Sequence, residues 1–453
     1  MQLKGINVLV FGAAKSGISA TRLLQKLEAN VILYDSNNKL KLEDFKEKLD
    51  INENFQLITG ELTNSIIDKI QLVILSPGVP IDLPEVNKIR EKGIPVWGEI
   101  ELAYRNTKGK IIGITGTNGK TTTASLVGEI MKAYYDDTYI VGNIGNPFTD
   151  IVLNTCDDTV IVAEISSFQL ETIEEFKPEI SAILNITQEH LDRHHSMETY
   201  IMMKENITKN QTRSEFCILN YEDEILRELG ERLNTKVMYF SSKRRLKSGL
   251  FMEENTIYYI DDYIEEKVCN IKELKILGKH NYENVMAATG IALTAGVPLE
   301  SIIEVIKSFQ AVEHRIEFVE TIGGVTYYND SKGTNPDASI KAIQAMVSPT
   351  ILIGGGYDKD LEFDDWIRSF DSKIKCLILL GQTREKIAET ARKNGFNNII
   401  LVNSLEEAVK ISAKKSVNGD AVLLSPACAS WGMFDNYEQR GRLFKEYIRR
   451  MVD

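Results

Sequence analysis

A glycine-rich turn at residues 116–121 carries residue types that suit phosphate chemistry. The run reads Gly116-Thr117-Asn118-Gly119-Lys120-Thr121. Glycines let backbone N–H groups turn inward around phosphate oxygens, and the positive end of a following helix adds to the attraction. Lys120 is spaced to reach the β- and γ-phosphates, and the Thr121 hydroxyl to bind Mg²⁺. This short G-x-x-G-K-T form predicts a nucleotide phosphate loop.

Residues elsewhere in the chain bear on which class of nucleotide-using protein this is. A GTPase is expected to read its base with an N-K-x-D run, and the nearest run, Asn87-Lys88-Ile89-Arg90, lacks the aspartate. A motor or pump is expected to follow its second metal strand with aspartate, whereas the apolar strand Val160–Ala163 ends in Glu164. A carboxylate at a strand end beside a phosphate loop is a ready metal ligand. The pattern favours ATP chemistry over a GTP switch.

Three of the five histidines lie close together after the strand Ile180–Leu184, in the run Glu189-His190-Leu191-Asp192-Arg193-His194-His195. Two interpretations stay open. The run could begin a surface helix capped by Thr187, or one histidine could bind a metal. Because no thiolates accompany the histidines, Mg²⁺ shared with carboxylates and phosphates fits better than zinc.

The bulk composition is that of a globular protein, with 43% apolar and 26% charged residues. The net charge of −12 argues against a general affinity for nucleic acid or anionic membranes. The five cysteines form no C-x-x-C pair, which favours reduced thiols in a cytoplasmic protein. No apolar run is long enough to span a bilayer. We interpret the apolar run Ile6–Ala14 as a buried first strand and not as a signal segment.

The elements that must position these residues fall into three α/β blocks, expected at 1–97, 98–310 and 311–453. The first and third alternate strands and helices in a Rossmann-like manner, and the central block has a P-loop mononucleotide-binding pattern. Helices are expected at Ile18–Leu27, Thr122–Ala133, Leu277–Phe309, Asp337–Met346, Arg384–Lys393, Leu405–Ala413 and from Phe434 onward. Further strands are expected at Val31–Tyr34, Leu72–Leu75, Lys110–Thr115, Val325–Tyr328, Thr350–Ile353, Cys376–Leu380, Ile399–Val402 and Ala421–Leu424.

Several runs in fixed order, spread over all three blocks, resemble the Mur ligases, which extend the peptide of the bacterial cell-wall precursor. The runs are Gly116–Thr121, Glu164–Leu170, Asn185–Arg193, His280-Asn281, His314-Arg315, Asn329–Asn335 and Leu424–Ser430.

The resemblance is to the member of this family that adds D-glutamate. The member that adds a diamino acid is expected to carry an Asp-Asn-Pro-Arg run, which is absent here. Folate polyglutamate ligases share the phosphate loop but are expected to differ at Asn329–Asn335. A folate or other Mur-type ligase, and a non-catalytic nucleotide-binding regulator, stay open as alternatives.

The resemblance implies a monomeric enzyme that uses ATP to join D-glutamate to the L-alanyl carboxylate of UDP-N-acetylmuramoyl-L-alanine. The reaction would pass through an acyl phosphate and release ADP and phosphate. Two Mg²⁺ ions and a carbamate on Lys204 are implied as well. No nucleic acid or membrane insertion is expected.

The resemblance also implies a role for individual residues. Catalysis is expected to involve Lys120, Glu164, His190 and Lys204, and metal binding Thr121, Glu164, His190 and Lys204. ATP is expected to meet Gly116, Thr117, Asn118, Gly119, Lys120, Thr121, Thr122, Asn281, Asn284, Arg315 and Asp330. The UDP substrate is expected to meet Asp35, Ser76, Gly78, Asn143, Ser166 and Gln169. D-glutamate is expected to meet Lys332, Thr334, Lys359, Ser430 and Tyr437.

Overall fold

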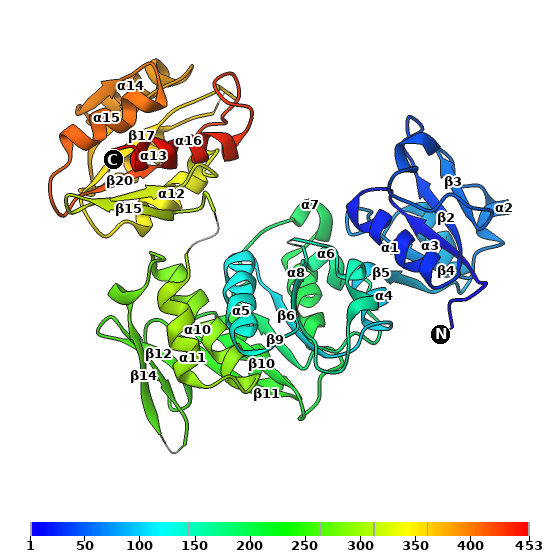
Figure 1. Ribbon diagram of the computed structural model, residues 1–453. Helices are drawn as coiled ribbons and strands as arrows, with labels where there is room; N and C mark the ends of the chain where they lie inside the picture. The colour runs from blue at the N-terminus through cyan, green and yellow to red at the C-terminus, as the bar shows by residue number, and fades with distance from the viewer. Residues whose placement is uncertain (1, 144, 263, 311–312, 360, 452–453) are drawn as a thin grey trace. The chain divides into compact units, whose positions relative to one another are not determined.

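The computed structural model contains three β-sheets, each flanked by helices (Figure 1). It divides into two compact units, one of Met1–Val268 with Glu283–Ile306 and one of Cys269–Tyr282 with Lys307–Asp453. The expected α/β class is confirmed. The described residues are 2–143, 145–262, 264–310, 313–359 and 361–451.

The first sheet opens the first unit and has five parallel strands in the order β3-β2-β1-β4-β5. This is a Rossmann-like order with β1 at its centre. Val8 and Val10 of β1 pack in one apolar core, while Leu9 and Phe11 pack in another, so both faces of the sheet are covered. The elements are β1 (Asn7–Phe11), α1 (Lys15–Lys26), β2 (Asn30–Asp35), η1 (Leu42–Phe45), β3 (Phe55–Thr59), α2 (Asn64–Ile67), β4 (Leu72–Leu75), α3 (Pro84–Glu91), β5 (Val96–Gly98) and α4 (Glu99–Tyr104).

The second sheet, also in the first unit, has nine strands in the order β14-β13-β12-β11-β10-β9-β6-β8-β7. Its parallel part places β6 between β8 and β9, so the carboxyl ends of these three strands share one edge. The strands are β6 (Lys110–Thr115), β7 (Thr138–Gly142), β8 (Val160–Glu164), β9 (Ile180–Ile183), β10 (Phe216–Asn220), β11 (Lys236–Ser241), β12 (Gly249–Glu253), β13 (Thr256–Ile260) and β14 (Glu265–Asn270). The helices are α5 (Lys120–Tyr134), η2 (Phe148–Asp150), η3 (Val152–Asn154), α6 (Ser167–Leu170), α7 (Leu191–His194), α8 (Met197–Glu205), η4 (Asn206–Thr208), α9 (Glu224–Arg232), η5 (Ile271–Glu273), α10 (Lys279–Thr294) and α11 (Leu299–Ser308).

The third sheet forms the second unit and has six strands in the order β15-β16-β20-β17-β18-β19. At its edge β15 pairs antiparallel with β16, and the other pairings described for this sheet are parallel. Leu352 of β17 packs in one core and its neighbours Ile351 and Ile353 in another, so this sheet too is covered on both faces. The elements are β15 (Glu317–Ile322), β16 (Val325–Asn329), α12 (Pro336–Ala345), β17 (Thr350–Gly354), α13 (Asp364–Arg368), β18 (Ile374–Leu379), α14 (Arg384–Lys393), β19 (Ile399–Leu401), α15 (Leu405–Lys415), β20 (Ala421–Leu424) and α16 (Tyr437–Arg449).

The expected strands are confirmed to within a few residues, and three details differ. The expected helix Leu277–Phe309 is two helices, because Gly296, with φ of 92°, ends the first and Pro298 precedes the second. The last helix begins at Tyr437, where the Asn436 side chain caps it by accepting a hydrogen bond from Gln439 N. Strands β3, β5, β7 and β10 to β15 had no counterpart in the sequence prediction. The block boundary expected at 311 falls outside the described residues.

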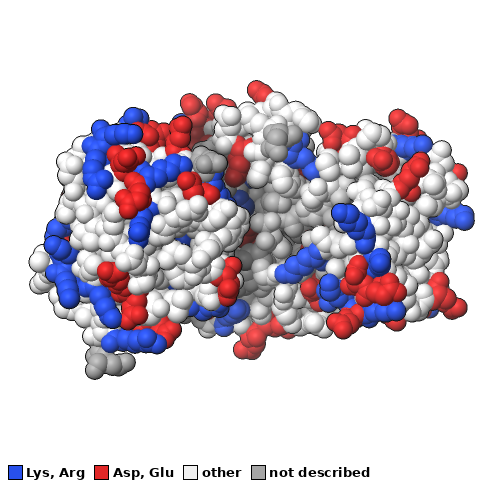
Figure 2. Space-filling view, turned by 90° about the horizontal axis from the view of Figure 1, so that it is seen from above, with Lys and Arg blue, Asp and Glu red and all other residues white. Residues whose placement is uncertain are grey.

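The described surface carries charge of both signs. On the face drawn in Figure 2, Lys and Arg side chains are interspersed with Asp and Glu side chains. Among the described residues, no helix has both the length and the apolar character needed to cross a membrane.

Candidate active site

The phosphate loop lies between β6 and α5, as expected. Gly119 has φ of 86° and Gly116 has φ of 148°, which are values that side chains other than glycine rarely adopt. A Cβ atom at residue 119 would overlap the amide oxygen of Asn284. A Cβ at residue 116 would lie 3.1 Å from that of Leu184. Both glycines are therefore needed, and the expected ATP contact Asn284 lies against the loop.

The loop is held by the residues that follow β9. Thr117 N donates to Asn185 O at 2.9 Å, and Asn118 N donates to the Asn185 side-chain oxygen at 2.8 Å. The Thr117 hydroxyl lies 2.9 Å from that of Tyr200 and accepts from Thr187 N at 3.0 Å. These bonds fix the conformation of the loop. Asn185 begins a run that carries the family resemblance, but the sequence assigned no loop contact to it or to Tyr200.

Two lysine ammonium groups meet at one carbonyl oxygen of this loop. Lys120 Nζ donates to Gly116 O at 2.7 Å, and Lys204 Nζ donates to the same oxygen at 2.8 Å. Lys204 is 2% exposed. Its burial, assisted by the nearby charge of Lys120, lowers the pKa of Lys204 to about 7. Close to neutral pH, this amine therefore has a substantial uncharged fraction, which is the form that reacts with CO₂.

Glu164 ends β8 at the same sheet edge and is buried. Its Oε1 accepts a hydrogen bond from Asn143 Nδ2 at 2.7 Å, whereas its Oε2 has no hydrogen-bond partner among the described residues. A buried carboxylate oxygen without a partner is costly and is the kind of atom that binds a cation. Thr121, expected to share that cation, is the second residue of α5.

The described residues contain no group of three or more His, Cys, Asp and Glu side chains able to hold a metal by themselves. The Glu164 carboxylate and the Thr121 hydroxyl fit Mg²⁺, which takes one or two protein oxygens and completes its shell with phosphate and water.

His190 is one of two exposed members of the histidine cluster, the other being His195. His190 precedes α7 with φ of 56°, and its side chain is 45% exposed. Its ring centroid lies 4.9 Å from that of Phe168, and its Nε2 lies 3.8 Å from a carboxylate oxygen of Glu189. The expectation that Thr187 caps a helix here is wrong, because Thr187 N binds the phosphate loop and the helix begins after His190.

His194 is buried and serves a structural purpose. Its Nε2 lies 3.0 Å from the Ser167 hydroxyl, and its Nδ1 lies 3.4 Å from Glu171 Oε1. Burial lowers the pKa of His194 to about 4, so the ring is neutral and can accept one of these bonds. The cluster of histidines seen in the sequence is thus divided between two exposed rings, His190 and His195, and one packed ring, His194.

A pocket in the first unit brings together two residues expected to meet the UDP substrate, Ser76 and Gln169. Ser166 and Gln169 also form a capping box at the start of α6, in which the Ser166 hydroxyl accepts from Gln169 N at 3.3 Å and Gln169 Oε1 accepts from Ser166 N at 2.9 Å. The pocket is lined by Leu75, Ser76, Pro77, Val79, Ile81, Gly98, Glu99, Phe168, Gln169, Glu171, Thr172 and Arg193.

The other expected UDP contacts lie at strand ends. Asp35, at the end of β2, accepts hydrogen bonds from Ala13 N and Asn37 N, both at 2.9 Å. Gly78 is exposed in the turn after β4, two residues from Ser76. The Asn143 side chain binds Glu164, which links the expected sugar contact to the expected metal ligand.

Glu99 is a pocket residue that the sequence prediction missed. Its Oε1 accepts from Phe148 N at 2.7 Å, and its Oε2 has no hydrogen-bond partner among the described residues. Burial raises the pKa of Glu99 to about 7. The available signal was a pair of glutamates, Glu99 and Glu101, alternating with apolar residues at the start of α4.

In the second unit, Asp330 follows β16 and is buried. Its Oδ2 accepts from the Ser425 hydroxyl at 2.7 Å, and its Oδ1 accepts from Ile316 N at 3.3 Å. Burial raises the pKa of Asp330 to about 7. Arg315 is exposed, next to Ile316 with φ of 46°. The expected ATP contact Asn281 donates its side-chain amide to Leu277 O at 2.7 Å.

Expected amino-acid contacts lie on loops after the parallel strands of this unit. Lys332 Nζ lies 5.9 Å from the ring centroid of Tyr437, and Thr334 N donates to Lys332 O at 2.9 Å. Lys359 Nζ lies 4.3 Å from the ring centroid of Trp431, which directly follows the buried Ser430. Trp431 is a further residue that the sequence prediction missed.

The fold and the site define an α/β protein of the Mur ligase class, and three family models match it. They are the MurD-like Mur ligase N-terminal domain at 6–98, the Mur ligase middle domain at 114–292 and the Mur ligase glutamate ligase domain at 314–428. The chain belongs to the Mur ligase family.

Curated relatives match the chain along its whole length. It is 57% identical to UDP-N-acetylmuramoylalanine–D-glutamate ligase of Lachnoclostridium phytofermentans and 48% identical to that of Clostridioides difficile, with 100% of both chains covered in each case.

Solved structures share the fold at low identity. UDP-N-acetylmuramate-alanine ligase MurC of Thermotoga maritima has a TM-score of 0.57 at 18% identity, covering 98% of this chain and 100% of that one. MurF ligase of Thermotoga maritima, in complex with ADP, has a TM-score of 0.58 at 16% identity, covering 99% of this chain and 96% of that one.

Proposed function

We propose that this protein joins D-glutamate to the L-alanyl carboxylate of UDP-N-acetylmuramoyl-L-alanine, using ATP and releasing ADP and phosphate. The observation that carries the proposal is the 57% identity, over all 453 residues, to a relative named for this activity. The proposal places the protein in peptidoglycan precursor synthesis, as a cytoplasmic monomer.

A free carboxylate is a poor acyl donor, so the nucleotide must first activate it. The L-alanyl carboxylate attacks the γ-phosphoryl group, which gives an acyl phosphate and ADP. Lys120, on the rigid loop, neutralises charge on the transferring group. The D-glutamate amine then attacks the acyl carbon, and phosphate leaves through a tetrahedral intermediate.

The residues around the loop support Mg²⁺ binding. Bound Mg²⁺ neutralises phosphate charge and orients the reacting oxygens. Thr121 and Glu164 would hold one ion, and His190 with Lys204 would support a second. Glu164 suits this role because its Oε2 is buried and has no partner among the described residues.

Lys204 suits a carbamate. Its pKa of about 7 supplies the neutral amine that CO₂ capture requires, and capture converts a buried cation into an anion. The anion would complement the cation of Lys120 beside Gly116 O, where two positive charges otherwise face each other.

The remaining assignments follow the family resemblance. The UDP substrate would bind at Asp35, Ser76, Gly78, Asn143, Ser166 and Gln169. ATP would bind at the loop 116–122 and at Asn281, Asn284, Arg315 and Asp330. D-glutamate would bind at Lys332, Thr334, Lys359, Ser430 and Tyr437.

The test offers ATP, Mg²⁺ and UDP-N-acetylmuramoyl-L-alanine with D-glutamate, L-glutamate or L-lysine in turn and measures phosphate release. Release with D-glutamate alone is the expected result. Release that depends on L-lysine or L-glutamate would move the protein to another member of the family. ATP binding without release under any condition would favour a regulator.

A further inference from the structure

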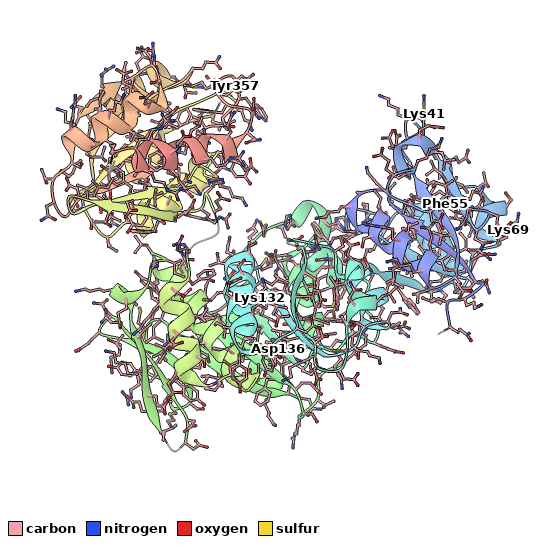
Figure 3. All side chains as sticks on the ribbon, in the orientation of Figure 1. Lys41, Phe55, Lys69, Lys132, Asp136 and Tyr357 are labelled. Atoms are coloured by element: carbon pink, nitrogen blue, oxygen red, sulfur yellow. The ribbon has the colours of Figure 1, made fainter. Side chains whose placement is uncertain are left out.

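The loops after β17 and β20 are joined at the edge of the second unit. β17 and β20 are neighbouring parallel strands, so the chain leaves both at the same edge. Tyr357 and Ala429 form an antiparallel bridge, in which Tyr357 N donates to Ala429 O at 2.9 Å. Tyr357, labelled in Figure 3, marks this edge. The bridge holds the segment with Lys359 beside the segment with Ser430 and Trp431.

An exposed aromatic pair lies at this junction. Trp431 is 53% exposed and Tyr357 is 39% exposed, although large aromatic side chains gain from burial. Their ring centroids are 5.6 Å apart in an edge-to-face arrangement. Each ring therefore steadies the other, and the indole face meets a cation, the Lys359 ammonium, at 4.3 Å.

The Lys359 ammonium contacts the indole face of Trp431, while the carboxylate next to it in sequence pairs with another lysine. The neighbouring carboxylate of Asp358 is paired with Lys386 at 3.1 Å. That ion pair also anchors the loop to α14. An aromatic face attracts an ammonium group without using its N–H donors, so the donors can still point at an incoming carboxylate.

We propose that Trp431 is a positioning residue for the amino-acid substrate, whose indole holds the Lys359 ammonium beside Ser430 to receive a substrate carboxylate. This inference rests on the proposed function, because it takes the amino-acid site to include Lys359 and Ser430. Without the ring, the flexible lysine side chain would be ordered only when the substrate binds, and the ordering would weaken binding.

The test measures KM for D-glutamate and kcat at saturating ATP and nucleotide substrate. Trp431→Leu, which removes the ring but keeps an apolar side chain, is expected to raise this KM roughly fivefold and to leave kcat within about twofold. Trp431→Phe, which keeps an aromatic face, is expected to restore most of the affinity. Tyr447→Leu is the matched control, since it removes a ring that faces Arg450 at 5.8 Å on α16.

A double-mutant cycle separates positioning from general loop damage. In a Lys359→Met background, Trp431→Leu is expected to change KM by less than about twofold, because the cation that the ring holds is gone. An equal rise of KM in both backgrounds, a wild-type KM in Trp431→Leu, or a Trp431→Phe variant as defective as Trp431→Leu would overturn the inference. If the wild-type protein releases no phosphate with D-glutamate, it is the proposed function that fails.

Discussion

The two units hold their substrate-facing lysines in different ways. In the first unit, the side-chain nitrogens of Lys120 and Lys204 donate to one backbone oxygen, Gly116 O, and Lys120 is the one that stays a cation under the proposed function. A hydrogen bond to a carbonyl oxygen fixes both the donor–acceptor distance and the direction of the N–H group. Such a cation has a defined position, which suits the stabilisation of charge that develops during phosphoryl transfer.

In the second unit, two lysines lie over aromatic rings. Lys359 is 4.3 Å from the ring centroid of Trp431, and Lys332 is 5.9 Å from that of Tyr437. A ring attracts a cation over its whole face and leaves the direction of the N–H bonds open. Under the proposed function, Lys120 beside the transferring phosphoryl group is held by a directional hydrogen bond, whereas Lys359 at the substrate carboxylate lies over a ring face.

The largest effect is expected from removing the tightly held cation of the phosphate loop. Lys120→Ala should lower kcat by about 10³-fold, because charge on the transferring phosphoryl group is no longer neutralised. Phosphate release measures the change. Lys132→Ala, on the same helix and labelled in Figure 3, should keep the wild-type rate. A Lys120→Ala enzyme with wild-type turnover would remove the loop from the mechanism.

A somewhat smaller loss of kcat is expected from changing Glu164, whose carboxylate lies at the end of β8. Glu164→Gln should lower kcat by about 10²-fold and raise the Mg²⁺ concentration needed for half-maximal rate, since the amide offers a cation no charge. A Mg²⁺ titration of phosphate release measures both changes. Glu129→Gln, an exposed glutamate on α5, is the control. An unchanged Mg²⁺ requirement would contradict a metal-binding role for Glu164.

Removal of Lys204 should lower activity in a way that an added carboxylate partly restores. Lys204→Ala should lose activity by about 10- to 100-fold, as for loss of a metal-supporting group, and a short-chain carboxylate should restore part of it. The measurement is kcat with and without the added acid. Full activity in Lys204→Ala would exclude the lysine, and a loss without rescue would argue against the carbamate.

Lys204 should also shape the pH dependence of stability. Its folded pKa of about 7 lies below its ordinary value of 10.5, so between these pH values the unfolded chain binds more protons. Stability therefore rises with pH across this window, and below pH 7 the cost of burying the charge is fully present. Lys204→Met should raise the thermal unfolding midpoint more at pH 6 than at pH 10. An equal shift at both pH values would contradict a buried titrating amine.

The smallest effect on KM is expected from changing Tyr437, whose ring lies farther from its lysine than Trp431 lies from Lys359. Tyr437→Leu should raise KM for D-glutamate by about twofold, because the cation lies farther from this ring than Lys359 lies from Trp431. Tyr437→Phe keeps the ring and should leave KM unchanged. An effect larger than that of Trp431→Leu would reverse the proposed ranking of the two rings.

The parallel strands and the phosphate loop could be predicted because their signals are local. A run of apolar residues before a glycine turn identifies β1, four of whose five residues are buried, and the loop occupies six consecutive positions. Strands β10 to β14, on one side of the second sheet, were among those missed. In β14, partly exposed residues mix charged and apolar types without a clear period, whereas the apolar and almost fully buried β10 was simply overlooked.

The arrangement of the site depends on contacts between distant segments. Nothing local marks Lys204 as buried; from α8 alone it would be a solvated lysine. Its meeting with Gly116 requires the fold, and only the family resemblance pointed to it. The pairing of Trp431 with Lys359 likewise depends on the bridge between Tyr357 and Ala429. Sequence patterns identified the reactive residue types, whereas burial and long-range pairing decided their environments.

The capping box of Ser166 and Gln169 has a consequence for ligand recognition. Each of these side chains is already fixed by the backbone of the other. Long polar side chains usually lose about 1.5–2 kcal/mol of rotamer freedom when they are immobilised. In Gln169 this loss has occurred during folding, so a ligand that recruits it meets a side chain with little entropy left to lose. The capping box of α6 therefore preorganises one side chain of the pocket before any ligand binds.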